Sequence, residues 1–322
     1  DGDEANQHAL KMLGVYRKFV ENYLAMSIVT GEKSKNERFP GAEITYTLEA
    51  MMQDKKALQL GTSHFLGQNF AKGSDITYQD SDGNMQHVYT TSWGVTTRMI
   101  GALIMNHSDD DGLVLPPKIA PHQVVILPIA HKNTNLDALH AYCEAIATRL
   151  SNTIYSDAPI RVHVDSRDRS GGEKNWSWVK KGVPIRLEVG QREMDADTVS
   201  MRIRTRDYKD RVNLSIDTLV NEVSDYLGEI QSFLFTQSTE RFMSHTKFCA
   251  NADEVEQAFS SQTMVLLYWF EDDTIEASLA TKYQASIRCF LDEFHPFDLP
   301  LEGPACFDKQ TKGRLALVAK AY

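Results

Sequence analysis

The sequence has few cysteines and no long apolar run. Four of its 322 residues are cysteine, and they stand far apart, at positions 143, 249, 289 and 306. So few thiols exclude a disulfide-stapled secreted domain and favour a reducing, cytoplasmic compartment. The longest apolar runs, residues 124–130 and 263–270, fall well short of the ~20 residues that a membrane span needs. A membrane partner is therefore not expected.

The sequence also lacks an initiator Met, internal repeats and low-complexity tracts. Its first residues, Asp1-Gly2-Asp3-Glu4, contain neither the basic nor the apolar region of a signal peptide. We therefore expect the chain to begin inside a longer protein. With 42% apolar and 24% charged residues it can bury a sizeable core, which excludes wholesale disorder. A mass of 36.4 kDa corresponds to two or three domains.

The chain has no overall excess of positive charge. Its 34 basic and 44 acidic residues give a net charge of −10, which argues against a sequence-independent nucleic-acid coat. The charge is uneven, however: residues 1–159 carry 13 basic and 18 acidic side chains, residues 160–211 carry 13 and 9, and residues 212–322 carry 8 and 17. The three nets are −5, +4 and −9. Only the middle span could attract a nucleic acid by charge.

The first third of the chain reads as an antiparallel sheet with helices, of the α+β type. Apolar residues recur at helical spacing over residues 4–23 and again over 98–106. Between them, residues 76–79 and 87–90 flank Asp82-Gly83, which predicts a hairpin with a tight turn.

The prolines Pro116 and Pro117 indicate a boundary, after which strands alternate with helices. This order predicts an α/β domain. Its expected elements are strand 123–128, helix 135–151, strand 160–164, a polar loop at 165–175 and strand 184–189. From about residue 216 the pattern predicts helices 219–235 and 253–260 and a strand at 264–270. We therefore expect three domains, 1–118, 119–215 and 216–322.

An ordered series of sequence strings carries a family resemblance. The strings are Phe39-Pro40-Gly41-Ala42, Gln59-Leu60-Gly61-Thr62-Ser63-His64, Ser92-Trp93-Gly94-Val95-Thr96-Thr97-Arg98, Gly112-Leu113-Val114-Leu115-Pro116-Pro117 and Gly182-Val183-Pro184-Ile185-Arg186. The series closely resembles prolyl-tRNA synthetases of the archaeal and eukaryotic type, which are class II aminoacyl-tRNA synthetases. It covers what looks like the C-terminal two-thirds of such an enzyme: the end of the class II catalytic domain, the anticodon-binding domain and a C-terminal α+β appendix. Motifs 1 and 2 have no counterpart.

The resemblance implies a proline–tRNA ligase, which activates proline with ATP and transfers it to tRNA(Pro). Arg98 matches the motif 3 arginine, a catalytic residue on the ATP phosphates, and a guanidinium suits that task because it stays ionised. Gln59, Thr62 and Thr96 match further ATP-binding positions. The matched proline-binding residues are Phe39, His64, Trp93 and Gly94. Each would by itself be an ordinary core, turn or surface residue. Without motif 2, the chain alone is expected to be inactive, and Mg²⁺ is expected only at the intact site.

In the middle domain, Arg186, Arg192 and Glu193 match the family's readers of two anticodon guanines. The parallel N–H donors of an arginine side chain match the acceptor atoms of guanine. Unpaired anticodon bases can be recognised one at a time. The alternative is a set of solvated charges on an edge strand. Val179 stands where the family usually carries Glu, which puts one base contact in doubt.

Relatives often hold zinc with four cysteines in the C-terminal domain. Cys289 and Cys306 match the first and last of these, but Pro296 and Pro304 occupy the other two positions, and His295 could supply at best a third ligand. Zinc is therefore not expected, and two buried free thiols are. Tyr322 ends the chain as related enzymes end, with a C-terminus that folds back towards the active site. Family enzymes are homodimers, but their interface uses motif 1, so the resemblance leaves dimerisation of this chain open.

Two other functions compete with the ligase. The first is a non-catalytic tRNA-binding paralogue or fragment that keeps the anticodon domain, which an in-frame motif 2 upstream of Asp1 would exclude. The second is a stand-alone hydrolase of mischarged tRNA, which nothing in the sequence resembles.

Overall fold

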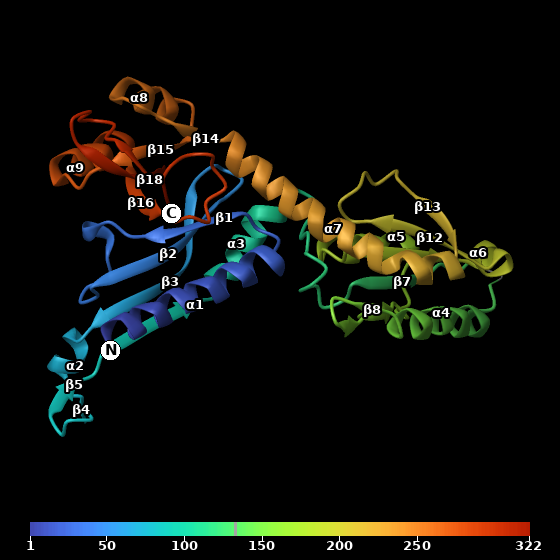
Figure 1. Ribbon diagram of the computed structural model, residues 1–322. Helices are drawn as coiled ribbons and strands as arrows, with labels where there is room; N and C mark the ends of the chain where they lie inside the picture. Colours follow the sequence, from blue (N-terminus) through green and yellow to red (C-terminus); the bar gives the residue numbers. More distant parts are fainter. Residues whose placement is uncertain (132–133) are drawn as a thin grey trace. The chain divides into compact units, whose positions relative to one another are not determined.

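The computed structural model describes residues 1–131 and 134–322, which form two compact units (Figure 1). Unit 1 contains residues 1–22, 26–106 and 237–322, and unit 2 contains residues 23–25 and 107–236. The grouping differs from the three predicted domains, because the first and last of these share one sheet. Within the described residues, no helix is both long and apolar enough to cross a membrane.

Unit 1 is built on a largely antiparallel sheet of nine strands. Its order is β14 (Thr246–Phe248), β15 (Met264–Trp269), β18 (Lys312–Lys320), β16 (Ala285–Leu291), β1 (Ile28–Glu32), β2 (Ile44–Met51), β3 (Ala57–Gly67) and β6 (Thr90–Val95), with β17 (Glu302–Pro304) paired to β18. The two ends of the chain meet where β1 pairs with β16, with Gly31 opposite Leu291. A Cβ atom on Gly31 would lie 2.0 Å from the carbonyl oxygen of Phe290. Only glycine allows this approach of the two strands.

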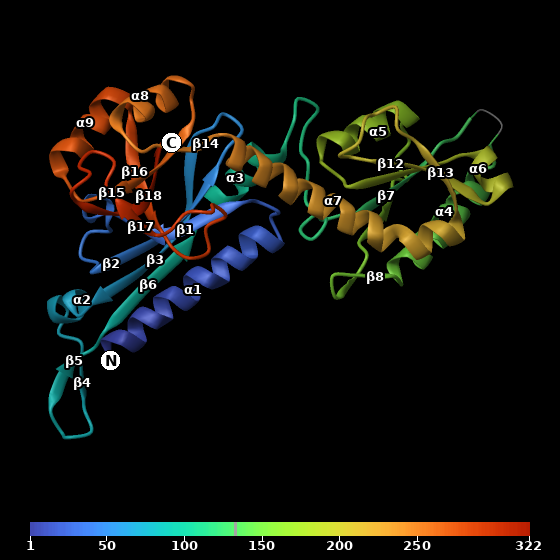
Figure 2. The same ribbon diagram turned by 45° about the horizontal axis from the view of Figure 1, so that its top comes forward.

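The helices of unit 1 cover this sheet (Figure 2). The N-terminal helix α1 (Gly2–Asn22) begins where the Asp1 carboxylate accepts a hydrogen bond from the amide of Glu4, 2.8 Å away. It buries Ala9, Leu13 and Val20. The other helical elements are η1 (Lys35–Glu37), α2 (Asn69–Gly73), α3 (Arg98–His107), α8 (Ala252–Ser260) and α9 (Asp273–Tyr283), and a separate hairpin joins β4 (Thr77–Gln79) to β5 (Met85–His87).

Unit 2 is a five-stranded sheet in the order β10 (Val162–Val164), β7 (Val124–Pro128), β11 (Ile185–Val189), β12 (Thr198–Ile203) and β13 (Val212–Ser215). The first three strands are parallel and the last two antiparallel. One face packs against α4 (Leu136–Ser151), α6 (Gln191–Ala196) and residues 216–236 of α7 (Ile216–Ser244), while α5 (Gly171–Lys180) contributes Trp178 to the other face. A short hairpin joins β8 (Ile154–Tyr155) to β9 (Ala158–Pro159).

The sequence prediction of a polar loop over residues 165–175 is wrong in its second half. Helix α5 begins at Gly171, inside the predicted loop. Its start is a capping box: the Ser170 hydroxyl accepts from the Glu173 amide, and the Glu173 carboxylate accepts from the Ser170 amide. The low helix propensity of Gly171 and Gly172 hides this signal in the sequence.

Candidate functional site

The register of three strands decides which predicted residues of unit 1 lie together. Residues directly opposite in paired strands point to the same face of a sheet. His64 lies opposite Thr45 and Ser92, and Thr62 lies opposite Thr47 and Gly94. Alternation along β2 and the pairing of Glu49 with Gln59 add these two residues to the same face. We call this set the polar face: Thr45, Thr47, Glu49, Gln59, Thr62, His64, Ser92 and Gly94.

The proline-binding candidates Phe39 and His64 lie at one end of the polar face. Their ring centroids are 4.9 Å apart. The Phe39 amide donates to Thr45 Oγ1 at 3.0 Å, and the same oxygen shares a hydrogen bond of 3.0 Å with His64 Nδ1. Burial lowers the pKa of His64, so its imidazole is neutral at pH 7. Phe39 is 46% exposed and can meet a ligand.

The ATP-binding candidates lie towards the other end. Arg98 begins α3, where its amide donates to Thr96 Oγ1 at 3.2 Å. Its guanidinium donates to the carbonyl oxygen of Gln59, also at 3.2 Å. Arg98 is exposed, so it can also contact an anion beside the polar face.

Trp93 is not part of this arrangement. It lies opposite Ser63, on the face that α1 covers. The Ser63 hydroxyl donates to the Ala9 carbonyl oxygen at 2.7 Å, and the Trp93 ring centroid lies 6.1 Å from that of His8. Trp93, predicted to bind proline, therefore lies on the opposite face of the sheet from His64, because adjacent residues of a strand point to opposite faces.

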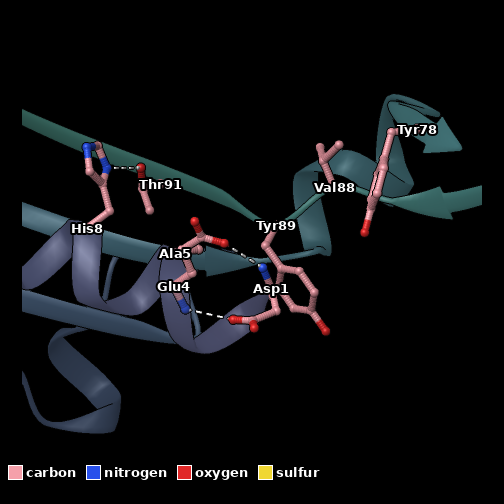
Figure 3. Close-up of a pocket in the computed structure, with 8 residues that line it drawn as sticks. All are labelled: Asp1, Glu4, Ala5, His8, Tyr78, Val88, Tyr89 and Thr91. Atoms are coloured by element: carbon pink, nitrogen blue, oxygen red, sulfur yellow. Dashed lines mark hydrogen bonds and ion pairs between the residues drawn. The ribbon is translucent and has the colours of Figure 1, made fainter. Parts of the chain in front are cut away.

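A hollow of about 470 Å³ opens elsewhere, between the start of α1, the entry to β6 and the β4–β5 hairpin (Figure 3). Its lining residues are Asp1, Glu4, Ala5, His8, Tyr78, Val88, Tyr89 and Thr91. His8 and Thr91 share a hydrogen bond of 3.4 Å at the end of the hollow away from Tyr78. None of the predicted site residues lines this hollow.

At its Gln59 end, the polar face includes a buried charge cluster that the sequence does not reveal. Glu49 is fully buried, and its carboxylate accepts from Lys33 Nζ at 3.0 Å and from Arg288 Nε and Nη2 at 3.1 Å. The Thr47 hydroxyl donates to the same carboxylate at 3.0 Å. Arg288 lies 239 residues from Glu49. No local sequence signal could have found this contact.

In unit 2 the anticodon-reading candidates differ in exposure. Arg192, in the first turn of α6, is exposed. Glu193 closes a capping interaction instead, since its carboxylate accepts from the Gly190 amide at 3.0 Å. Arg186 is only 3% exposed, and β11 is an inner strand, so the alternative of a solvated edge-strand charge is wrong for this residue. Val179 is buried.

Arg186 is held without a carboxylate partner among the described contacts. Its Nε donates to Asn175 Oδ1 at 3.0 Å, while Arg186 Nη1 and Asn175 Nδ2 are buried and make no hydrogen bond. Burial, and then the nearby Arg204 and Arg202, lower the pKa of Arg186 to about 10. Two buried donors without acceptors are costly, and a ligand with acceptor atoms would satisfy them.

Unit 2 also has an ion pair at the C-terminal ends of its parallel strands, which the sequence did not predict. Asp165 follows β10 and accepts from Arg167 at 2.7 and 2.6 Å and from Trp178 Nε1 at 2.8 Å. Burial raises the pKa of Asp165, but these hydrogen bonds outweigh it and hold the pKa well below its usual range. Ligands of open α/β sheets bind at this end of the strands.

All four cysteines are buried free thiols, which agrees with the prediction for Cys289 and Cys306. Cys289 and Cys306 belong to different hydrophobic clusters. Cys306 shares its cluster with Cys249, and the amides of these two residues donate to Tyr268 and Leu266 of β15. His295 Nδ1 accepts from the Phe297 amide at 3.2 Å. Across residues 1–131 and 134–322, no three His, Cys, Asp or Glu side chains are grouped to hold a metal ion.

Comparison with known proteins assigns most of unit 2 to a known domain family. Residues 123–226 match the anticodon binding domain family. The chain is 41% identical to Proline--tRNA ligase 2 of Anaeromyxobacter dehalogenans over 99% of its own length and 64% of the relative's. It is 45% identical to Proline--tRNA ligase of Protochlamydia amoebophila, over 89% of the chain and 58% of the relative, and 40% identical to that of Bdellovibrio bacteriovorus, over 99% and 64%.

These matches and the antiparallel-dominated sheet of unit 1 give the chain the fold class of class II aminoacyl-tRNA synthetases that carry an anticodon-binding domain. Within that class it is a relative of prolyl-tRNA synthetases, as the sequence strings predict. The chain spans a little under two thirds of the length of these relatives.

Proposed function

We propose that this chain is the C-terminal part of a cytoplasmic proline–tRNA ligase. In this proposal the polar face of unit 1 holds ATP and proline, and unit 2 binds the anticodon of tRNA(Pro). The observation that carries the proposal is the single row of Gln59, Thr62 and His64 on β3, with Phe39 at one end and Arg98 at the other. The expected domains 1–118, 119–215 and 216–322 remain part of the proposal.

The ATP half of the reaction needs positioning more than chemistry. The proline carboxylate is already a nucleophile, and it attacks the α-phosphorus of ATP to form prolyl-adenylate and release pyrophosphate. Arg98 stays ionised and offers forked donors to the phosphates, which neutralises charge as it develops. Gln59, Thr62 and Thr96 supply neutral hydrogen-bonding groups that orient the nucleotide.

The proline half needs a compact apolar pocket with a polar edge. Phe39 and His64 provide two ring faces 4.9 Å apart for contact with the pyrrolidine ring. Because the pKa of His64 is lowered by burial, its neutral imidazole does not repel the positively charged imino group. Gly94 exposes its backbone beside Thr62, which allows close approach of the substrate.

No metal enters this proposal as a reactant held by this chain. The described residues offer no group of three or more metal-ligating side chains, so none is assigned to Mg²⁺, which is proposed only as the ion that accompanies ATP. The separation of Cys289 from Cys306 in the core does not fit the relatives' four-cysteine zinc site.

For tRNA, the net charge of +4 over residues 160–211 supports a nucleic-acid partner. The exposed Arg192 is proposed to read a guanine edge directly. Arg186 is buried and would reach a base only from beneath α5 and the segment 204–211. Glu193 fixes the start of α6. Its proposed part in anticodon reading is to hold the first turn of that helix in position.

Proline-dependent ATP–pyrophosphate exchange tests the catalytic part. We expect no exchange by this chain alone and robust exchange by a longer protein that also carries motifs 1 and 2. In the longer protein, Arg98→Ala should lower the exchange rate by about 10²–10³, as for loss of one donor to transition-state charge. Arg314→Ala, which removes an exposed arginine paired with Glu32, should change it less than twofold.

Robust exchange by this chain alone would contradict the proposal. A longer protein that binds tRNA(Pro) but shows no exchange would instead support the non-catalytic paralogue.

A further inference from the structure

Two large aromatic side chains of unit 2 stack on each other while exposed to solvent. Trp176 of α5 is 46% exposed, and Tyr208, in the segment 204–211 between β12 and β13, is 56% exposed. Their ring centroids lie 6.3 Å apart with an angle of 6° between the ring planes. Exposed aromatic rings held parallel present a flat apolar surface of a kind that core packing does not require.

Cations surround this aromatic pair. The Arg202 guanidinium lies 4.6 Å from the Tyr208 ring centroid and donates to the Tyr208 carbonyl oxygen, which fixes the segment 204–211 on the sheet. Arg206, Lys209 and Arg211 of the same segment add positive charge, which Asp207 and Asp210 of that segment and the neighbouring Glu229 and Glu188 largely balance. The net charge of +4 over residues 160–211, rather than the segment 204–211 alone, favours a negatively charged partner.

The two unpartnered donors described above lie beneath the pair. Arg186 is directly opposite Arg202 in the β11–β12 register, so both side chains lie on the face of the sheet that carries Tyr208. Asn175, which binds Arg186, is the residue before Trp176. Arg186 Nη1 and Asn175 Nδ2 are therefore buried donors next to an exposed aromatic surface.

We infer that Trp176 and Tyr208 form a stacking platform for one unpaired nucleobase of a tRNA loop, with Arg186 and Asn175 donating to the edge of that base. The inference rests on the proposed tRNA-binding function and names the residues that hold the base. A nucleobase fits each feature: its π-face stacks on aromatic rings, its carbonyl and ring-nitrogen acceptors match the two donors, and its phosphates match the surrounding cations.

The test uses the full 322-residue chain and stem-loop RNAs with the anticodon loop of tRNA(Pro). Affinity is measured for the unmodified RNA and for a series in which each loop nucleotide in turn is abasic. Trp176→Ala and Tyr208→Ala should each weaken binding of the unmodified RNA by roughly 5- to 150-fold, the range for loss of one base–aromatic stack. Trp176→Phe keeps a ring and should retain most of the affinity. Phe233→Ala, which removes an aromatic ring of unit 2 that is 48% exposed on α7, should leave the affinity unchanged.

One abasic position should reproduce the loss seen with Trp176→Ala, and Trp176→Ala should weaken binding of that RNA no further. Equal affinities of the wild type and both alanine variants would overturn the platform while leaving tRNA binding intact. An equal loss for every abasic RNA would also overturn it, because the missing contact would then not be to a base. Failure of the wild type to bind any of the RNAs would overturn the proposed function itself, and the platform with it.

Discussion

Replacing Glu49 by Gln tests the buried charge cluster of unit 1. The substitution keeps the size and the hydrogen-bonding capacity of the side chain but removes its charge. Lys33, 2% exposed, and Arg288, 10% exposed, then face each other without a counter-charge. Leaving buried charge unpaired in this way costs about 3–5 kcal/mol of unfolding free energy. Arg288→Met should lower the unfolding free energy less, because Glu49 still has Lys33 as its ion-pair partner.

Urea-induced unfolding measures this loss. In a background of Trp176→Phe and Trp178→Phe, the remaining tryptophans, Trp93 and Trp269, both report on unit 1. The expected loss for Glu49→Gln corresponds to a midpoint lower by roughly 1–5 M urea, given typical denaturant slopes of about 1–3 kcal/mol per M.

An exposed ion pair of similar length serves as a control, because it separates the effect of burial on stability from the effect of ion pairing. Glu256 and Lys282 form an ion pair of 2.9 Å, nearly the length of the Lys33–Glu49 pair, but their side chains are 56% and 53% exposed. Glu256→Gln should therefore cost no more than about 1 kcal/mol. If Glu49→Gln shifted the midpoint no more than this control, the reasoning on the buried cluster would be refuted.

Three further predictions concern the sheet junction, the acid stability of unit 2 and the thiols. Gly31→Ala should cost about 1–3 kcal/mol or more in the same urea assay, because its Cβ would overlap the Phe290 carbonyl oxygen, whereas Gly14→Ala, with open space around it, should be neutral or stabilising; similar midpoints for both would contradict the packing argument. The lowered pKa of Asp165 means that its ionised form stabilises unit 2 fully above about pH 4 and less as the pH falls, so Asp165→Asn should flatten the acid-induced loss of stability measured by circular dichroism; an unchanged slope would count against this. Burial raises the pKa of Cys249 to about 11 and of Cys306 to about 12, so neither thiol should react quickly with a thiol reagent at pH 8 until the protein unfolds; rapid labelling of the native chain would disprove it.

Periodicity and turn chemistry predicted several local elements. The hairpin around Asp82-Gly83, the helix over residues 135–151 and the buried strand over residues 123–128 are confirmed by β4–β5, α4 and β7. Each of these has a signal within a few residues of sequence. The predicted fold class and the resemblance to prolyl-tRNA synthetases are likewise confirmed.

Features that depend on register or on distant residues escaped prediction. Trp93 stands between two polar-face residues in the sequence, but the alternation of a strand sends it to the α1 side. Cys306 lies in the core cluster of Cys249 because both segments bind β15, which the spacing of the cysteines cannot show. The Glu49–Arg288 contact and the β1–β16 pairing bring the two ends of the chain into one unit, and neither has a local signature.

The site residues divide in the same way. Gln59, Thr62 and His64 were predicted from one continuous string, and β3 places all three on one face. Their roles towards ATP and proline remain predictions. Trp176 and Tyr208 lie 32 positions apart in the sequence, and only the fold of the segment 204–211 brings them together.

The central claim, that unit 2 recognises the anticodon of tRNA(Pro), is tested most directly by one affinity comparison. The full chain is titrated with a tRNA(Pro) transcript and with the same transcript in which the two anticodon guanines are replaced by other bases. Loss of base contacts worth ~1–3 kcal/mol each should weaken binding by about tenfold or more. Equal affinity for both transcripts would show that binding depends only on the phosphate backbone, and would contradict recognition of the anticodon by unit 2.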